Sequence, residues 1–404
     1  MIIRKIELAE FRNYERQSIA AEPGINVFYG DNAQGKTNIL EAVYLCACAR
    51  SHRTARDVDL IRHSADRYAV QLDFVNQNGS EDEIEIEYLD SVTGDPQRTR
   101  SQRIVRLNGL RLERISELMG LFHAVIFAPE DLMLVKEGPS TRRRYLDLLI
   151  SQVRPSYFSN LQQFSRYLLQ RNRLLKQLRE KRSFGQTNLD EQSRMHLDVW
   201  NQSLAEQAAG LIEQRIIYTR RIGELAGQAQ EKISSGKEKL FIKYRTVPGL
   251  KPDFTKKQIK DYYLEKLNTS LQEDLDKGTT NHGPHRDDLE LSLDGEGLKP
   301  FASQGQQRSA VLSLKLAELA ILRQDTGEAP VLLLDDVMSE LDESRRIRLL
   351  ENINDSQVFV TCTDAQQVVS EIRQEKHLDM AAAQNEKLFT FYHVTQGQVQ
   401  KMEK

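Results

Sequence analysis

The nine residues GDNAQGKTN, from Gly30 to Asn38, constrain the fold of this 404-residue chain more than any other stretch. They fit the pattern G-x4-G-K-[ST] and lie between the apolar run INVFY and the amphipathic run ILEAVYLC, which is the strand–loop–helix context that this pattern requires. Backbone N–H groups of such a loop, together with the helix N-terminus, hold phosphate groups. A glycine turn without a ligand is the alternative, and the flanking strand and helix disfavour it.

The loop predicts ATP with Mg²⁺ as the ligand. Lys36 is expected to neutralise the β- and γ-phosphate oxygens, and the hydroxyl of Thr37 to coordinate Mg²⁺. The residues predicted to contact ATP here are Gly30, Asp31, Asn32, Ala33, Gln34, Gly35, Lys36, Thr37 and Asn38.

An acidic partner for this loop lies far along the chain, in the run VLLLDD from Val331 to Asp336. An apolar run that ends in carboxylates is expected of a buried parallel strand, which presents Asp335 to the metal at its C-terminal end. Asp336 is then expected to orient or deprotonate the attacking water. A strand followed by an acidic turn would explain VLLLDD alone, but the phosphate loop favours the metal site.

The pattern of the chain changes twice between these two motifs. Residues 1–125 predict short strands with one helix after the phosphate loop, and FHAVIFAP predicts a further strand. Residues 140–235 predict long helices that form a helical hairpin turning at SFGQTN, with limbs of roughly 30 residues and about 45 Å. After residue 280 the α/β pattern returns and ends in one terminal strand, KLFTFYHVTQGQVQ. The predicted domains are 1–125, 126–280 and 281–404.

A long predicted helix is preceded by the string SQGQ, which consists of Ser303, Gln304, Gly305 and Gln306. This string predicts a second anion site at the start of the helix. An ordinary helix cap is the alternative for this string alone. SQGQ resembles the S-G-G-Q signature of ABC-type ATPases, with Gln304 in place of a glycine. In that family the signature of one subunit meets the γ-phosphate held by another subunit, which implies roles for Ser303, Gly305 and Gln306 in ATP binding, and a catalytic role for Ser303 beside Lys36 and Asp336. Ser339–Asp342, SELD, resembles the D-loop that crosses the same interface.

Across essentially its whole length the chain resembles the RecF family of SMC-type ABC ATPases. The strings that carry this resemblance are FRNY, GDNAQGKTN, FAPEDL, STRRRYLD, NHGPHRDD, SQGQQR and LLLDDVMSELD. The family implies an α/β fold: an ABC-type P-loop ATPase head with a strand-rich flank, interrupted by an α-helical arm. It also implies an ATP-dependent homodimer and a role in recombinational repair and replication-gap processing, in which the protein helps RecO and RecR to load RecA onto single-stranded DNA.

Two positions depart from the wider ABC pattern. Pro129, Glu130 and Asp131 stand where many relatives have a glutamine that touches Mg²⁺. Thr361, Cys362 or Thr363 stands where many have a switch histidine, and the sequence does not distinguish among the three. Both departures predict slow ATP hydrolysis, and so does Asp336, since glutamate is usual at that position. A slow ATPase of this kind is expected to act as a dimerisation switch.

Basic residues are concentrated in a chain whose formal net charge is only −3. Residues 142–182 contain eleven Lys or Arg against Asp147 and Glu180, which is typical of a phosphate-binding face, although a solvated face would explain any one run. The residues predicted to contact DNA are Arg50, Arg53, Arg56, Arg142, Arg143, Arg144, Arg171, Arg173 and Lys176. Arg142, Arg143 and Arg144 have a contact with nucleotide or with the dimer interface as their alternative. No base-reading motif is present, so the predicted binding is to the DNA backbone of gapped, junction or single-stranded DNA.

Three cysteines, Cys46, Cys48 and Cys362, predict reduced core thiols in a cytoplasmic protein, because they are too few for a disulfide framework and the chain has no run long enough to span a membrane. His285 and Arg286 are left open between a structural hairpin and a role near the nucleotide. The rival functions are a transporter ATPase subunit, which the basic arm disfavours, and an SMC-like head that tethers DNA, which would need a longer coiled coil.

Overall fold

The computed structural model describes the chain except residues 92–100, 184–189, 352–355, 367–368, 371–388 and 403–404. The chain divides into two compact units. The first contains Met1–Met133, Leu225–Lys239 and Ser303–Lys404, and the second contains Leu134–Glu224 and Leu240–Ala302. The first unit is therefore assembled from distant parts of the sequence.

One sheet of the first unit is parallel except at one edge, and its strand order is β15-β14-β3-β13-β12-β8. Its strands are β3 (Ile25–Tyr29), β8 (Ala124–Phe127), β12 (Val331–Asp335), β13 (Val358–Cys362), β14 (Phe389–Thr395) and β15 (Gln398–Lys401). All five residues of β12 and of β13 are buried, which is why VLLLD and VFVTC read as unbroken apolar runs.

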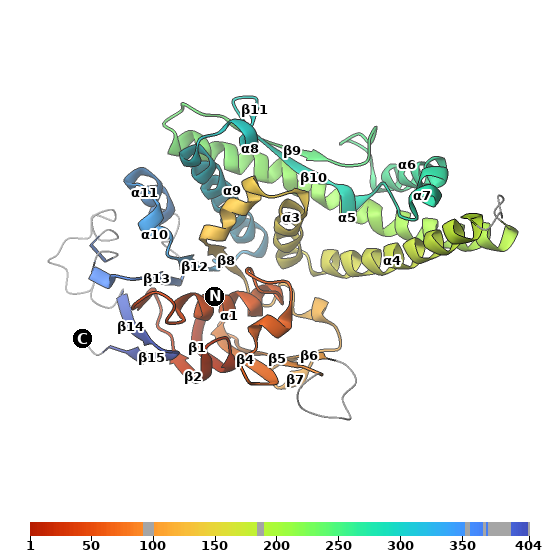
Figure 1. The fold of residues 1–404 in the computed structure, drawn as a ribbon. Coiled ribbons are helices and arrows are strands. Elements are labelled where there is room, and N and C mark those ends of the chain that lie inside the picture. Colours follow the sequence, from red (N-terminus) through yellow and green to blue (C-terminus); the bar gives the residue numbers. More distant parts are fainter. Residues whose placement is uncertain (92–100, 184–189, 352–355, 367–368, 371–388, 403–404) are drawn as a thin grey trace. The chain divides into compact units, whose positions relative to one another are not determined.

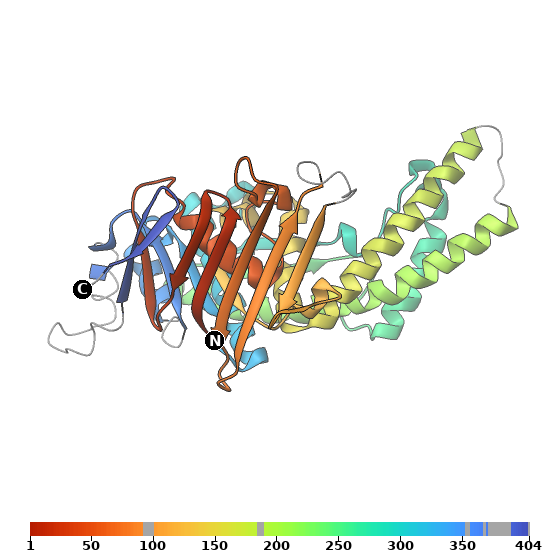
Figure 2. The same ribbon diagram turned by 90° about the horizontal axis from the view of Figure 1, so that it is seen from below.

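The second sheet of this unit is antiparallel, with the order β2-β1-β4-β5-β6-β7, and Figure 2 shows it as red to orange arrows. Its strands are β1 (Ile2–Phe11), β2 (Tyr14–Ala20), β4 (Arg67–Val75), β5 (Glu81–Leu89), β6 (Gln102–Leu107) and β7 (Leu110–Arg111). Asn108 and Gly109 connect the last two strands with positive φ angles of 51° and 76°, as the Asn-Gly hairpin signal predicts.

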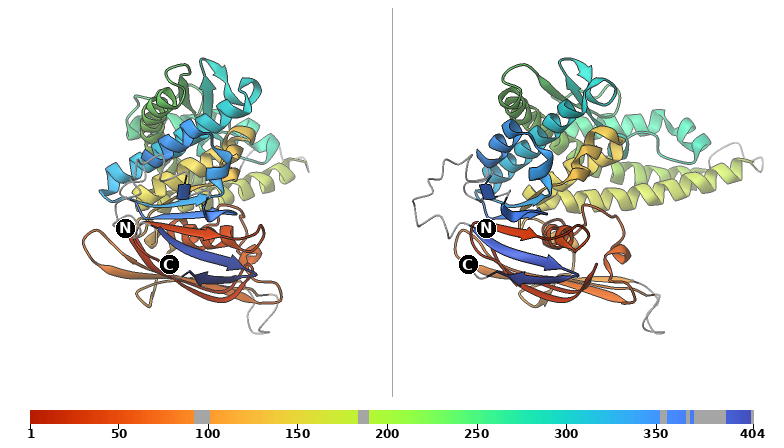
Figure 3. Two further views of the ribbon diagram at one scale, coloured as in Figure 1. Left: turned by 90° about the vertical axis from the view of Figure 1, so that its left-hand side faces the viewer. Right: turned by 60° about the vertical axis from the view of Figure 1, so that its left-hand side comes forward.

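Helix α1 (Lys36–Cys48) lies between the two sheets, since it contacts β8, β12 and β13 on one side and β4 and β5 on the other. Eleven of its thirteen residues are buried, so its sequence is apolar nearly all round. The sheets also meet at their edges, where the Gln17 side chain of β2 donates to the Val399 carbonyl of β15 and accepts from its N–H. Figure 3 shows the blue C-terminal strands beside the red N-terminal ones.

The first unit also contains helices in several parts of its sequence. They are α9 (Gln304–Thr326), α10 (Val337–Glu340), α11 (Glu343–Glu351) and the 3₁₀ helices Asp57–Leu60, Ile115–Glu117 and Pro129–Leu132. Helix α2 (Met133–Lys136) leads into the second unit.

The second unit consists mainly of helices, and α4 and α5 run side by side in it (Figures 1 and 2). Its elements are α3 (Pro139–Val153), α4 (Pro155–Ser183), α5 (Glu191–Ile233, whose C-terminal end belongs to the first unit), β9 (Leu240–Arg245), α6 (Lys256–Thr269), α7 (Leu271–Lys277), the 3₁₀ helix Pro284–Arg286, β10 (Asp288–Leu293), β11 (Glu296–Gly297) and α8 (Leu298–Phe301). The 29 residues of α4 span about 44 Å, close to the predicted limb length, whereas the 43 residues of α5 span about 65 Å and exceed it.

Arg171 of α4 lies in the core of this second unit and is fully buried. Its guanidinium forms an ion pair with Asp274 of α7 at 2.7 Å, and it donates to Asn201 of α5 and to Thr280. Leu175, Leu178, Leu197 and Leu275 form an apolar cluster among the same three helices. The pair therefore ties α4 to α7 from within the core.

A second buried arginine, Arg215 of α5, holds together the segments around the string NHGPHRDD. It forms ion pairs with Asp147 and Asp287 at 2.9 Å each, and its Nη1 donates to the Pro284 carbonyl. His285 follows Pro284 directly in the sequence and is partly buried. Its Nε2 lies 3.0 Å from the Thr280 carbonyl oxygen. These contacts favour the structural interpretation of His285, whereas Arg286 is exposed.

One predicted element is wrong in its limits. The terminal strand KLFTFYHVTQGQVQ is a hairpin of β14 and β15, because Gln396 and Gly397 both adopt positive φ angles that turn the chain. The predicted turn SFGQTN lies almost entirely outside the described residues.

The predicted domain limits at residues 125 and 280 stay a prediction. The compact units have their boundaries after Met133, Glu224, Lys239 and Ala302, and β10 pairs with β9 in a small sheet of the second unit. The cysteines are buried thiols, as predicted. Among the helices described here, none combines the length and the apolar composition that crossing a bilayer demands.

We predict that Arg171→Met lowers the free energy of unfolding by about 3–5 kcal/mol, since Asp274 would keep a buried charge without its cationic partner. Arg173→Met is the matched control on the same helix, because Arg173 is exposed, and it should change this free energy by about 0.5 kcal/mol or less. Urea unfolding of both variants measures the difference. Equal effects would contradict the buried role of Arg171.

A second prediction concerns pH. Burial lowers the pKa of His285 from 6.5 to about 4, so below pH 6.5 the unfolded chain binds a proton that the folded chain does not. The free energy of unfolding should therefore fall as pH drops from 6.5 to 4, by up to about 3 kcal/mol from this residue. His285→Gln should flatten the curve in that window when urea unfolding is compared at pH 7 and pH 4.5. Parallel curves for the two proteins would refute the assignment.

Candidate nucleotide site

The phosphate loop lies at the C-terminal end of β3, a central strand of the parallel sheet. β3 pairs with β13 on one side and with β14 on the other, and β13 in turn pairs with β12. Because the carboxyl ends of parallel strands meet at the same sheet edge, the loop after β3 and the carboxylates after β12 are brought together there.

Glycine is required at two positions of this loop because other parts of the chain approach it closely. Gly30 has a φ of +146°, and a Cβ there would lie 2.4 Å from the Val394 carbonyl oxygen of β14. Gly35 has a φ of +115°, and a Cβ there would lie 2.6–2.8 Å from the side chains of Asn13 and Tyr14. Any other residue at either position would push the loop away from its supports.

The turn between β1 and β2 supports the loop from the antiparallel sheet. Tyr14 donates from its hydroxyl to the Gly35 carbonyl at 3.0 Å, and Asn13 donates to the Gln34 carbonyl at 2.8 Å. Asn38 of α1 donates to the Asn13 side-chain oxygen at 2.9 Å. These contacts give a physical role to the string FRNY as a support of the phosphate loop.

Arg12 of the same turn anchors helix α1. Its guanidinium donates to both carboxylate oxygens of Glu41 at 2.8 Å, and to the Asp59 carbonyl. Glu41 is fully buried; burial acts to raise its pKa, but hydrogen bonds from Arg12 and Ser51 outweigh this and hold the pKa below its usual range. Sequence reasoning missed this pair, although an isolated glutamate in the apolar helix ILEAVYLC was a signal that an arginine must reach it.

The β14–β15 turn supports the loop from the other side. The Gln396 N–H donates to the Gln34 side-chain oxygen at 2.7 Å, and the Gly397 N–H donates to the Gln34 carbonyl at 3.2 Å. Gln34 therefore links the loop to the C-terminal hairpin, which the sequence analysis did not connect with the nucleotide.

Lys36 points back across the loop that precedes it. Its ammonium group donates to the carbonyls of Gly30 and Asp31 at 2.6 and 2.7 Å. Burial lowers the pKa of Lys36, while the nearby carboxylates, with Asp336 foremost, act to raise it. The cation is thus held at the mouth of the loop, where a β- or γ-phosphate would lie.

Thr37 and Asp335 lie 298 residues apart in sequence and are in direct contact. The Thr37 hydroxyl donates to Asp335 Oδ1 at 2.8 Å, and the Thr361 hydroxyl of β13 donates to the same oxygen at 2.7 Å. Burial raises the pKa of Asp335, and the two hydrogen bonds oppose that rise. Thr361 also accepts from the Asp336 N–H at 3.0 Å, so it positions both aspartates.

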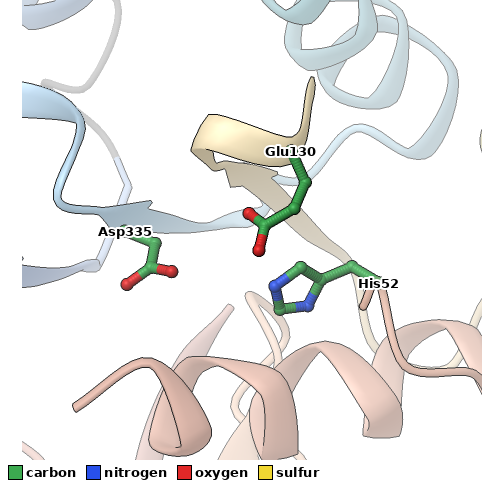
Figure 4. Close-up of side chains that lie close together, drawn as sticks. All are labelled: His52, Glu130 and Asp335. Carbon is green, nitrogen blue, oxygen red and sulfur yellow. The ribbon is translucent and has the colours of Figure 1, made fainter. Parts of the chain in front are cut away.

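Two further side chains, those of His52 and Glu130, lie near Asp335. One ligand atom from each of His52, Glu130 and Asp335 lies within 4.8 Å of the other two, and Figure 4 shows the three side chains turned toward one another. Hydroxyl and carboxylate oxygens are the donors that Mg²⁺ prefers. Thr37, Asp335 and Glu130 therefore fit a Mg²⁺ site.

Asp336 follows β12 directly and is exposed, with a φ of +51° that turns the chain into α10. Among Thr361, Cys362 and Thr363, the first holds Asp335, the second is buried with its thiol near the Phe28 carbonyl, and the third is exposed. Ser339 and Glu340 have side chains outside the described part of the structure.

The string SQGQ forms the start of α9. Ser303 accepts from the Gln306 N–H at 3.2 Å, and the Gln306 side chain accepts from the Ser303 N–H at 2.9 Å, which is a capping box. Gln306 also donates to Glu238, which accepts from Gln230 at 2.7 Å. Ser303 and Gln304 are exposed, so this helix start faces outward.

The structure separates the basic residues into different groups. Arg171 is buried, and a guanidinium with no exposed surface cannot contact a phosphate, so we withdraw it from the predicted DNA contacts. Arg142 forms a bidentate pair with Asp288, and Arg143 donates to the Asp287 carbonyl, while Arg144 is also half-buried. Arg173 and Lys176 are exposed on α4.

The arginines after α1 also differ in their surroundings. Arg53 donates to Asn38 at 3.1 Å and lies 3.7 Å from both Glu41 and Glu130, which places it beside the nucleotide site. Arg56 is exposed and paired with Asp59, and Arg50 is exposed.

Comparison with known proteins identifies the family. Residues 2–388 match the model of the RecF/RecN/SMC N terminal domain. The chain is 43% identical to DNA replication and repair protein RecF of Acetivibrio thermocellus over 364 residues, which cover 90% of this chain and 94% of that protein. It is 41% identical to the protein of the same name from Ruminiclostridium cellulolyticum, over 90% of this chain and 93% of that protein.

Solved structures agree with this result. A structure described as the recombination mediator protein RecF with ATP in the RecFOR pathway is 34% identical to this chain and matches 100% of it and 98% of its own chain, with a TM-score of 0.84. The Smc head domain of Pyrococcus furiosus, at 16% identity and a TM-score of 0.52, shares the fold alone. The chain belongs to the RecF/RecN/SMC N-terminal domain family and, within it, to the RecF proteins.

Proposed function

We propose that this protein is an ATP-controlled DNA-binding protein of recombinational repair and replication-gap processing. The observation that carries the proposal is the contact between Thr37 and Asp335, which joins the phosphate loop to the acidic strand end in a chain of the RecF family. The ATP-bound structures of its relative support ATP as the nucleotide.

In this proposal Lys36 and the backbone of Gly30–Thr37 hold the phosphates. Thr37, Asp335 and Glu130 would hold Mg²⁺, which supplies charge neutralisation at the phosphate oxygens. Asp336 orients the water that attacks the γ-phosphate, and its exposed position leaves room for that water. Arg53, which lies beside Glu130, contributes positive charge at the same edge.

ATP binding controls dimerisation in this proposal. The outward-facing start of α9, with Ser303, Gly305 and Gln306, binds the γ-phosphate held by a second copy, so that two ATP molecules are enclosed between two chains. Hydrolysis is slow and releases the dimer, because Pro129, Glu130 and Asp131 stand where faster relatives carry a glutamine. Thr361, Cys362 or Thr363 stands where those relatives carry a histidine. The enzyme is then a switch and not a motor.

DNA binds through its phosphate backbone, and the exposed face of α4 offers basic side chains for that contact. Arg166, Arg173 and Lys176 are exposed there and lie within about 80° of one another at about 100° per residue. Gapped or junction DNA is the proposed substrate. RecR and RecO are the proposed partners, with loading of RecA as the outcome; the name of the RecF structures, which refers to the RecFOR pathway, supports this.

The dimer switch is tested with substitutions at the two halves of the composite site. Asp336→Asn should bind ATP, lose at least about 100-fold in hydrolysis rate and remain dimeric, because removal of a general base commonly costs 10²–10⁴-fold. Ser303→Arg should bind ATP through its own loop and stay monomeric, and Lys36→Met should not bind ATP. Light scattering after gel filtration with ATP measures the outcome. An ATP-dependent dimer of Ser303→Arg would reject the model.

The DNA surface is tested by fluorescence anisotropy of a labelled gapped duplex, with and without ATP, over a range of salt concentrations. Arg173→Gln and Lys176→Gln should each weaken binding and reduce the slope of log K against log salt by about 1, since each removes one phosphate contact. Lys257→Gln, at an exposed position of α6, is the matched control. Unchanged slopes in both α4 variants would place the DNA elsewhere.

A further inference from the structure

Arg345 lies near the start of α11, directly after the D-loop string SELD, and connects that string to the signature helix α9. Its Nη1 pairs with the Asp342 carboxylate at 2.5 Å, its Nη2 donates to the Gly305 carbonyl at 2.8 Å, and its Nε donates to Ser309 Oγ at 2.9 Å. The side chain is only 17% exposed, whereas Asp342 is 56% exposed. One guanidinium thus contacts both the first turns of α9 and the D-loop string.

The three contacts form a closed arrangement. Ser309 Oγ donates to the same Gly305 carbonyl at 3.2 Å, and the Arg345 N–H donates to Asp342 Oδ1 at 3.0 Å. Each polar atom of the guanidinium therefore has a partner in a fixed direction. The guanidinium is always charged and presents its donors in a rigid planar fork, so lysine could not reproduce these contacts.

We infer that Arg345 is a positioning residue that holds the signature Ser303–Gln306 and Asp342 of the D-loop in one rigid unit, which this chain presents to the ATP of a second copy. This inference rests on the proposed ATP-dependent dimer and deepens it. Gly305 belongs to the predicted phosphate-binding string, and its carbonyl is fixed by Arg345 while Ser303 and Gln304 stay exposed. The neighbouring chain thus meets a preformed surface.

The same geometry separates two effects of a substitution. Within the described residues, Arg345 contacts Gly305, Ser309 and Asp342. None of these three residues is part of the chain's own phosphate loop. Loss of Arg345 should therefore leave ATP binding by its own chain intact and impair the site that this chain completes for its partner.

The first experiment compares Arg345→Ala and Arg345→Lys with Arg348→Ala. Arg348 is the matched control because it lies on the same helix and pairs with Glu351 on that helix at 3.0 Å. With ATPγS, the dimer Kd should rise at least about tenfold in both Arg345 variants, as expected for lost charge-assisted hydrogen bonds. The affinity for a fluorescent ATP and the melting temperature should stay close to those of the unchanged protein, and Arg348→Ala should dimerise normally.

A mixing experiment shows in which subunit the residue acts. In the first mixture, a donor-labelled Lys36→Met chain meets an acceptor-labelled Arg345→Ala chain. One composite site is then intact, with its phosphate loop from the Arg345→Ala chain and its signature from the Lys36→Met chain. ATP-dependent energy transfer should therefore appear. A chain that carries both substitutions, mixed with the unchanged chain, retains no intact composite site, and energy transfer should be absent. Equal transfer in the two mixtures would overturn the inference.

The outcomes also separate this inference from the proposed function. If the unchanged protein does not dimerise with ATPγS, the proposed dimer switch fails. If it dimerises and Arg345→Lys dimerises equally well, the dimer stands and the positioning role is rejected. If Arg345→Ala melts at a much lower temperature, Arg345→Lys replaces it in the mixing experiment. If Arg345→Lys also loses affinity for ATP, Arg345 has a general structural role and the inference is overturned.

Discussion

The hydrogen bond between the Thr37 hydroxyl and the Asp335 carboxylate is the contact on which the candidate site depends. The two residues lie 298 positions apart and meet only because β3, β13 and β12 are adjacent parallel strands. Thr361 on the middle strand accepts from the Asp336 N–H and donates to Asp335, so it positions both aspartates at the end of β12. A disturbance of this sheet order would separate the phosphate loop from its acidic partner.

Around this contact, the loop is held by segments from both ends of the chain. The β1–β2 turn contacts Gln34 and Gly35 through Asn13 and Tyr14, and the β14–β15 turn contacts Gln34 through two backbone N–H groups. Arg12 anchors α1 through the buried carboxylate of Glu41. A buried ion pair of this kind is costly to break on one side, so the support also makes the loop sensitive to changes outside its own motif.

The basic residues of the helical unit show why charge alone does not predict a binding surface. On α4, Phe164, Arg171, Leu175 and Leu178 recur at helical spacing on one buried face, while Arg166, Arg173 and Lys176 lie on an exposed face. Helical periodicity thus contained a signal that Arg171 faces the core. Its partner Asp274 could not be identified in this way, because the pair joins two helices about a hundred residues apart in sequence.

The ATPase motifs, the α/β class, most strand and helix positions and the interruption by helices could be predicted from the sequence. Short-range patterns suffice for these, since neighbouring residues are enough to recognise a glycine-rich loop, an apolar strand or an amphipathic helix. Only the folded chain shows which residues meet: Arg12 with Glu41, the C-terminal hairpin with Gln34, Glu130 with Asp335, and Arg345 with Gly305. These contacts depend on strand order and on side chains that cross between distant segments, and local propensity carries no information about either.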